Sequence, residues 1–250
     1  MSENELAVRF FDRAIELLAL VRDEEAEPIS RAAELVADRV AAGGRVFAYG
    51  AGHSALAAQD LVYRAGGLAV VNLLPVPGAV GVEAPATLGS ALERVDGLAT
   101  AVLDHSPARA GDVLIVISLS GRNALPVEMA RHAGESGLHV IGVTSLAYAV
   151  DTTSRHSSGT FLKDHCDVVL DNHVPVGDTV LTSPDIPAPF APASTVVISA
   201  LLQAVIAAAA GELAARGVEP PLLRSGNVDG GTEWNERVLA ENADRVFYRR

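Results

Sequence analysis

The stretch VLIVISLSGRN, residues 113–123, changes abruptly from apolar to small polar side chains. Its first five residues are rich in β-branched types, as in a strand that is buried on both faces. Ser118 and Ser120 then supply hydroxyl donors, Gly121 allows a close approach of the backbone, and a predicted helix with free amides follows at once. Hydroxyls and helix amides together can surround a phosphate group without a fixed lysine, so the stretch predicts a phosphate-binding loop.

A second loop of this kind occurs in YGAGHSA, residues 49–55, again between a predicted strand and a predicted helix. Gly50 and Gly52 allow a tight turn, and Ser54 stands where the helix amides point outward, which suits an anion. The loop lacks the third glycine of a dinucleotide-binding fingerprint. Together, the two loops favour phosphate binding more strongly than either does alone.

Gly52, Gly121, Arg122 and Asn123 are also predicted to contact the substrate or its phosphate. Simpler structural roles remain open for three residues of these loops. Ser54 and Asn123 could each cap the helix that follows, and Arg122 could be a solvated surface residue.

Apolar strands alternate with helices along most of the chain, which predicts βαβ units and a parallel sheet. Five strands are expected, at residues 45–50, 68–74, 112–118, 138–145 and 167–171. Helices are expected at 6–22, from Pro28 to the Gly43–Gly44 pair, and at 55–67, 88–103, 126–136 and 194–216, with an extended loop at 172–193.

Composition restricts the class of protein. The 250 residues are 49% hydrophobic and 20% charged, as in a well-packed globular protein, and the net charge of −12 argues against a nucleic-acid surface. A single cysteine, Cys166, excludes an internal disulfide and fits a reducing compartment. The apolar run at 195–210 is too short for a typical membrane span and suits a helix in a subunit interface. We therefore expect a cytoplasmic protein with no secretory signal and no membrane segment.

The motifs GAGHS and SLSGRN resemble the paired signatures of the sugar isomerase (SIS) domain family. Further segments, among them SRHSSG, DNHVPVGD and NVDGGTEWN, look like a bacterial, phosphoheptose-isomerase-like subgroup. The resemblance implies binding of a phosphorylated sugar, with phosphate contacts from Ser54, Ser118 and Ser120. Asn123 departs from the Ser or Thr common in the family at that position.

The resemblance also implies an α/β fold, a three-layer α/β/α sandwich around a five-stranded parallel, flavodoxin-like sheet. We expect one SIS domain over residues 1–250, made of N-terminal helices (1–42), an α/β core (43–217) and a C-terminal segment (218–250) that closes the site. It further implies a homodimer or higher homo-oligomer with a shared active site.

Enzymes of this family mostly remove a proton next to a carbonyl with a glutamate or histidine. Glu83 lies in a Gly/Pro loop where a carboxylate has no evident structural task, and Glu233 follows a Gly–Gly turn, where the helix dipole alone would favour an acid. His53 could reach a sugar oxygen. Arg64 and Asn227 are candidate substrate-binding residues, although a surface salt bridge would equally explain Arg64.

The preferred function is abstraction of the C2 proton of an amino-sugar 6-phosphate of the N-acetylglucosamine 6-phosphate class, with elimination at C3. The alternatives are an aldose–ketose sugar-phosphate isomerase and a non-catalytic sugar-phosphate sensor. No cofactor is expected. The spacing of His165, Cys166 and His173 matches no recognised metal pattern, so no metal site is predicted.

Overall fold

The structure is a computed structural model that describes residues 3–82 and 85–249. Two helices, α1 (Glu3–Glu24) and α2 (Ala26–Ala41), precede the first strand and confirm the predicted helical start. The remaining elements, in chain order, are β1 (Val46–Gly50), α3 (Ser54–Asp60), β2 (Val71–Leu73), α4 (Ala86–Leu92), α5 (Leu98–Asp104), β3 (Val113–Ile117), α6 (Ala124–Glu135), β4 (His139–Thr144), α7 (Ala147–Asp151), the 3-10 helix η1 (Leu162–His165), β5 (Val168–Asp171), β6 (Thr179–Ser183), β7 (Ile186–Pro192), α8 (Ser194–Ala215) and α9 (Gly231–Glu241).

The five predicted strands form one parallel sheet in the order β2-β1-β3-β4-β5. After β1 the chain passes to β2 on one side and later returns to β3 on the other, so the strand order reverses between β1 and β3. Such a switch point leaves a crevice at the carboxyl ends of the two strands, where sheets of this kind bind ligands. Gly50, which ends β1, pairs with Ile117, which ends β3.

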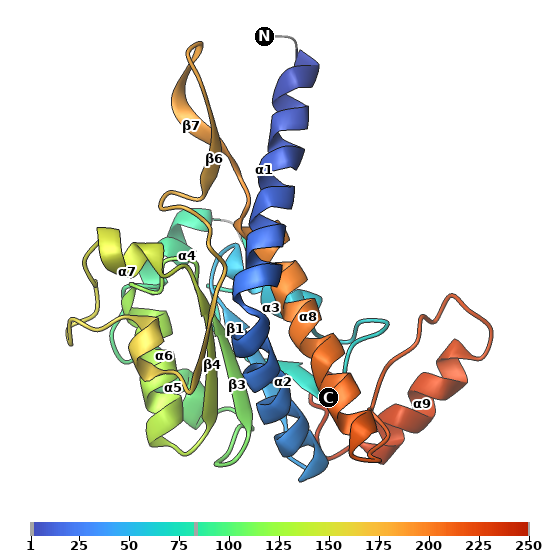
Figure 1. The fold of residues 1–250 in the computed structure, drawn as a ribbon. Coiled ribbons are helices and arrows are strands. Elements are labelled where there is room, and N and C mark those ends of the chain that lie inside the picture. Colours follow the sequence, from blue (N-terminus) through green and yellow to red (C-terminus); the bar gives the residue numbers. More distant parts are fainter. Residues whose placement is uncertain (1–2, 83–84, 250) are drawn as a thin grey trace.

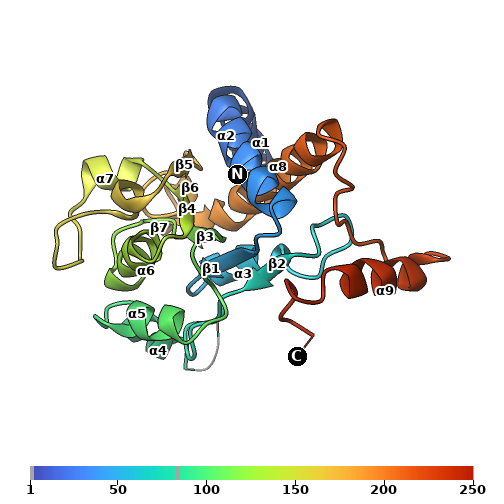
Figure 2. The same ribbon diagram turned by 90° about the horizontal axis from the view of Figure 1, so that it is seen from below.

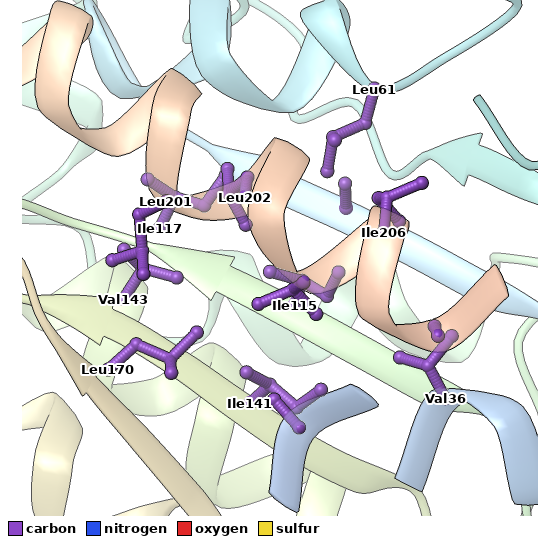
Figure 3. Close-up of a cluster of buried hydrophobic side chains, with 14 of the residues drawn as sticks. Val36, Leu61, Ile115, Ile117, Ile141, Val143, Leu170, Leu201, Leu202 and Ile206 are labelled. Atoms are coloured by element: carbon purple, nitrogen blue, oxygen red, sulfur yellow. The ribbon is translucent and has the colours of Figure 1, made fainter. Parts of the chain in front are cut away.

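Helices cover both faces of the sheet, which confirms the three-layer α/β/α sandwich (Figure 2). Alternate residues of β3 explain why. Val113, Ile115 and Ile117 pack in a cluster with α2, α3 and α8, whereas Leu114 and Val116 pack in a second cluster with α5 and α6. Because both faces of the strand are buried, its sequence is continuously apolar. Figure 3 shows the first cluster, in which side chains of the sheet meet those of α8 and α2.

Two predicted helices are interrupted in the structure. The predicted helix 55–67 ends at Asp60, and Tyr63 has a positive φ of 50° that is incompatible with a continuing helix. The predicted helix 88–103 is instead two helices, α4 and α5, separated by residues 93–97; Gly97, which precedes α5, has a left-handed φ of 83°. These breaks correct both predictions.

The predicted extended loop 172–193 is also corrected, since most of it is the antiparallel hairpin β6–β7. The hairpin and the N-terminal half of α1 project from the same end of the molecule (Figure 1). The strands were not predicted because the segment has four prolines, at 184, 187, 189 and 192, and proline is disfavoured in sheets except at edges.

Helix α8 is long and apolar enough in composition to cross a membrane. Its buried side chains, including Val197, Leu201 and Val205, instead pack in the cluster against the sheet. A core helix passes the same compositional test, so the helix is weak evidence for a membrane span.

Candidate functional site

A pocket of about 370 Å³ lies where the loops after β1 and β3 meet. Its lining brings together Gly52, His53 and Ser54 from the first loop and Ser118 and Ser120 from the second. The volume falls within the range of small-molecule sites. The two sequence motifs, more than sixty positions apart, thus share one cavity at the switch point of the sheet.

Two glycines shape the first loop. A Cβ on Gly50 would lie 2.4 Å from the carbonyl oxygen of Ser54, so only glycine lets α3 begin this close to the end of β1. Gly52 has a φ of +56°, and its N–H donates to the carbonyl of Ala79 at 3.2 Å. His53 makes no side-chain cap for α3.

The second loop turns back on itself through Ser118. The Gly121 N–H donates to Ser118 Oγ at 3.2 Å, which leaves the hydroxyl proton of Ser118 available to a ligand. Gly121 has a φ of +57°, and a Cβ there would lie 2.7 Å from Thr144 Oγ1. The hydroxyl of Ser120 has no hydrogen-bond partner among the described residues, so two hydroxyl donors face the pocket from this loop.

Asn123 does not cap α6, because the structure gives it no side-chain bond to the first helical turn. Its amide Nδ2 donates to Glu93 Oε2 at 2.7 Å, and the Glu93 carbonyl accepts from the Leu125 N–H at 3.0 Å. Glu93 lines the pocket, and its Oε1 lies 3.7 Å from the position of a Cβ on Gly52. Asn123 therefore holds a pocket carboxylate, and sequence reasoning missed that carboxylate because it assigned Glu93 to the middle of one long helix.

Tyr49 also lines the pocket and was missed. Its side chain is 0% exposed, yet its hydroxyl has no hydrogen-bond partner among the described residues. Burial and then the negative charge of Glu93 raise the pKa of the Tyr49 phenol well above its usual range, so the group stays protonated. The available signal was a polar hydroxyl in the otherwise apolar strand VFAYG, one residue before the glycine loop.

Asp178 and Ser194 complete the polar wall near α8. Asp178 Oδ1 accepts from the Ser194 N–H at 2.8 Å, and Oδ2 accepts from the Ser194 hydroxyl at 2.7 Å. The carboxylate thus satisfies the first amide of α8, and its negative charge at the helix start disfavours an anion there.

The SRHSSG segment is tied to the second loop by its backbone. The Arg155 N–H donates to the Arg122 carbonyl at 2.8 Å, and the Leu162 N–H donates to the Gly121 carbonyl at 2.8 Å. The Arg155 guanidinium approaches Asn123 Oδ1 at 3.5 Å. Gly121, Arg122 and Asn123 do not themselves line the pocket, although Gly121 binds Ser118 and Asn123 binds Glu93.

Glu83 lies outside the described residues. Three further predicted site residues do not line this pocket. Arg64 forms a salt bridge with Asp60, Asn227 donates its backbone N–H to Ser225 Oγ at 3.2 Å, and Glu233 is exposed on α9. Of the described residues in the C-terminal segment, none lines the pocket, because the segment passes along the β2 edge of the sheet (Figure 2).

Metal binding has no ready ligand set in the described ranges 3–82 and 85–249, where no group of three or more His, Cys, Asp and Glu side chains could hold an ion.

Relatives with similar sequences span the whole chain. A UPF0309 protein from Streptomyces avermitilis is 71% identical over 251 residues, covering 100% of both chains. The UPF0309 protein GK1441 from Geobacillus kaustophilus is 40% identical and covers 95% of this chain and 94% of its own.

Solved structures with the same fold include sugar-phosphate proteins. Phosphoheptose isomerase GmhA from Neisseria gonorrhoeae superposes with a TM-score of 0.53 at 22% identity, over 83% of this chain and 97% of its own. The Vibrio vulnificus NanR protein complexed with ManNAc-6P superposes with a TM-score of 0.52 at 14% identity, over 96% of this chain and 67% of its own. Likeness at this level of identity establishes the fold. Residues 9–145 match the SIS domain family model, and the chain belongs to the SIS domain family.

Proposed function

We propose that this protein is an enzyme that removes the C2 proton of an amino-sugar 6-phosphate and eliminates the C3 hydroxyl as water. N-acetylglucosamine 6-phosphate represents the substrate class. The observation that carries the proposal is the shared pocket, in which Ser54, Ser118 and Ser120 supply hydroxyls for a phosphate and Glu93 adds a carboxylate. The ManNAc-6P in the NanR structure and the sugar phosphate in the name of GmhA support a phosphorylated sugar as the ligand.

The proposed reaction needs a base and a polar environment for the leaving hydroxyl. A carboxylate takes the C2 proton of the open-chain aldose, and the electrons of the C2–H bond form an enolate across C1 and C2. The enolate then forms the C2–C3 double bond while the C3–O bond breaks, and the hydroxyl takes a proton and leaves as water. The product is an unsaturated aldehyde that has lost one water and kept its phosphate.

Glu83 is the proposed base. It follows Val82, which lines the pocket, and the Gly/Pro-rich loop gives its carboxylate no structural task in the sequence. His53, from the first loop, is proposed to contact a sugar oxygen. The expected results are loss of turnover with retained binding for Glu83→Gln and weaker phosphate binding for Ser120→Ala.

An aldose–ketose isomerase is the second candidate, and the similarity of fold to phosphoheptose isomerase favours it. It would use the same first step and return the proton to C1. A sensor without turnover is the third candidate, and a NanR-like fold that holds ManNAc-6P favours it.

Incubation of the purified protein with a panel of sugar 6-phosphates in D₂O, followed by NMR and mass spectrometry, separates the three. N-acetylglucosamine 6-phosphate should lose one water. A ketose with deuterium at C1 would instead establish an isomerase, and binding without either change would establish a sensor. Glu236→Gln, an exposed carboxylate on α9, is the matched control for Glu83→Gln and should keep full activity.

We also propose a homodimer with a shared site in a reducing, cytoplasmic setting. Val8, Phe11 and Ile15 follow one face of α1 and are 54%, 64% and 62% exposed, which is unusual for large apolar side chains in a stripe. A second chain would cover this stripe and could bring Arg64, Asn227 or Glu233 toward the pocket. Light scattering should give twice the chain mass, and Phe11→Glu should give a monomer.

A further inference from the structure

We propose that Tyr49 and Glu93 form a pair that recognises one hydroxyl group of the bound sugar. Tyr49 donates a hydrogen bond to the oxygen of this hydroxyl, and Glu93 accepts a hydrogen bond from it. This inference rests on the proposed function, because it assumes that the pocket holds a phosphorylated sugar. It adds two specificity-determining residues to the phosphate-binding loops.

The first argument is that Tyr49 is alone among the described tyrosines in being buried without a partner. The Tyr248 hydroxyl donates to the Ala69 carbonyl at 2.8 Å, the Tyr148 hydroxyl accepts from the Gly177 N–H at 2.8 Å, and Tyr63 is 60% exposed to water. A buried hydroxyl that has lost water without gaining a protein partner destabilises the fold, so such groups are rare unless they serve a ligand. Tyr49 is among the residues that line the pocket, where a ligand can supply the missing acceptor.

The second argument is the state of Glu93. Its Oε2 is occupied by the Asn123 amide at 2.7 Å, whereas Oε1 faces the Gly52 side of the pocket and makes no hydrogen bond to a described residue. One oxygen therefore fixes the carboxylate and the other is left to accept. The charge of Glu93 also acts on Tyr49 and, together with burial, keeps the phenol in its donor form.

The neutral donor Tyr49 and the anionic acceptor Glu93 line the same pocket and together select for a particular chemical group. A hydroxyl accepts one hydrogen bond and donates another, so it satisfies both residues. A carbonyl oxygen cannot donate to Glu93, and an ammonium cannot accept from Tyr49. The pair therefore distinguishes a sugar hydroxyl from either alternative at the same position.

The test uses N-acetylglucosaminitol 6-phosphate, which keeps the hydroxyls and the phosphate but has no carbonyl and cannot react. Its dissociation constant is measured by calorimetry for the full chain, for Tyr49→Phe, for Glu93→Gln and for the double variant, with inorganic phosphate as the second probe. Tyr248→Phe, which removes a hydroxyl remote from the pocket, is the matched control.

We expect Tyr49→Phe to weaken binding of the alditol phosphate about tenfold or more, with inorganic phosphate binding unchanged. The loss in the double variant should be smaller than the product of the single losses, because both residues hold the same hydroxyl. One deoxy analogue of the alditol should bind the wild type and Tyr49→Phe equally. Ligand-free Tyr49→Phe should melt at a higher temperature than the wild type, which separates this result from a folding defect.

Equal binding of the alditol phosphate by the wild type and Tyr49→Phe would overturn the inference and leave the proposed function standing. A parallel loss of alditol phosphate and inorganic phosphate binding would also overturn it, since the tyrosine would then act through the phosphate loop. Failure of the wild type to bind any of the sugar phosphates would overturn the proposed function and the inference together.

Discussion

The substitution Gly121→Ala is a direct test of the second loop. Gly121 has a φ of +57°, a left-handed conformation that any residue with a Cβ adopts at a cost. The added methyl would lie 2.7 Å from Thr144 Oγ1 and 3.2 Å from Leu162 Cβ. Thr144 cannot easily yield, because its hydroxyl donates to the Leu119 carbonyl at 3.2 Å. The loop between Ser118 and Arg122 must therefore move.

The expected loss of stability has two parts. The left-handed backbone costs about 1–2 kcal/mol for alanine, partly offset by about 0.4–1 kcal/mol from the stiffer unfolded chain. Inserting a methyl group into a packed site costs about 1–3 kcal/mol more. The net loss is about 1–5 kcal/mol, and each kcal/mol lowers the melting temperature of a chain of this size by about 2–4 °C.

Gly217→Ala is the matched control for this loss. Gly217 has a φ of +74°, and a Cβ there would meet nothing within 4 Å, so the substitution carries the backbone cost without the collision. Melting is followed by differential scanning fluorimetry with and without a sugar 6-phosphate at about 100 times its dissociation constant, which stabilises a binding-competent protein by about 2.7 kcal/mol. Gly217→Ala should keep this ligand-induced rise and Gly121→Ala should lose most of it. If Gly121→Ala has the same melting temperature as Gly217→Ala and keeps the ligand-induced increase, the reasoning about the loop is refuted.

Four further predictions concern residues outside the pocket loops. Arg45 and Asp112 form an ion pair at 3.0 Å, and their side chains are 7% and 2% exposed. Asp112→Ala should therefore lower the free energy of unfolding, measured by urea denaturation, by about 3–5 kcal/mol. A decrease below about 1 kcal/mol would contradict this. Asp178→Asn keeps the left-handed backbone but weakens the cap on Ser194, and should lower the melting temperature by about 2–4 °C; an unchanged melting temperature would show that the cap is dispensable. Burial raises the pKa of the Cys166 thiol from 9.0 to about 12, so a maleimide at pH 8 should label the native thiol about 1,000-fold more slowly than the urea-unfolded chain. The raised pKa also means that the thiol contributes stability below pH 9 that is lost as the pH rises toward 12; denaturation midpoints of wild type and Cys166→Ala should converge over that range, and parallel curves would contradict the assignment.

The sheet could be predicted from the sequence because its strands are apolar on both faces. In β3, the short run from Val113 to Ile117 is rich in β-branched residues, which favours a strand buried between two helical layers. The loops after β1 and β3 could be predicted as neighbours for the same reason, since parallel strands bring their carboxyl ends to one edge.

The walls of the pocket could not be predicted, because they depend on contacts between elements. Glu93 is the C-cap of α4, and Gly97 begins a new helix four residues later, a break that a periodic apolar pattern does not reveal. The role of Tyr49 depends on the absence of a partner for its hydroxyl, which no local pattern encodes. Asn123 binds a residue thirty positions earlier, so its identity could not be linked to Glu93 from the sequence.

The packing of α2 against α8 has a consequence for synthesis of the chain. These helices lie side by side on one face of the sheet, although one ends at Ala41 and the other begins at Ser194 (Figure 3). While the ribosome makes the chain from its N-terminus, the strands emerge before the helix that completes their cover. The apolar face formed by Ile115, Ile117 and their neighbours therefore remains exposed to water until α8 has left the exit tunnel of the ribosome. A nascent chain halted before residue 194 should bind chaperones that recognise apolar segments, whereas a chain released beyond 215 should escape them.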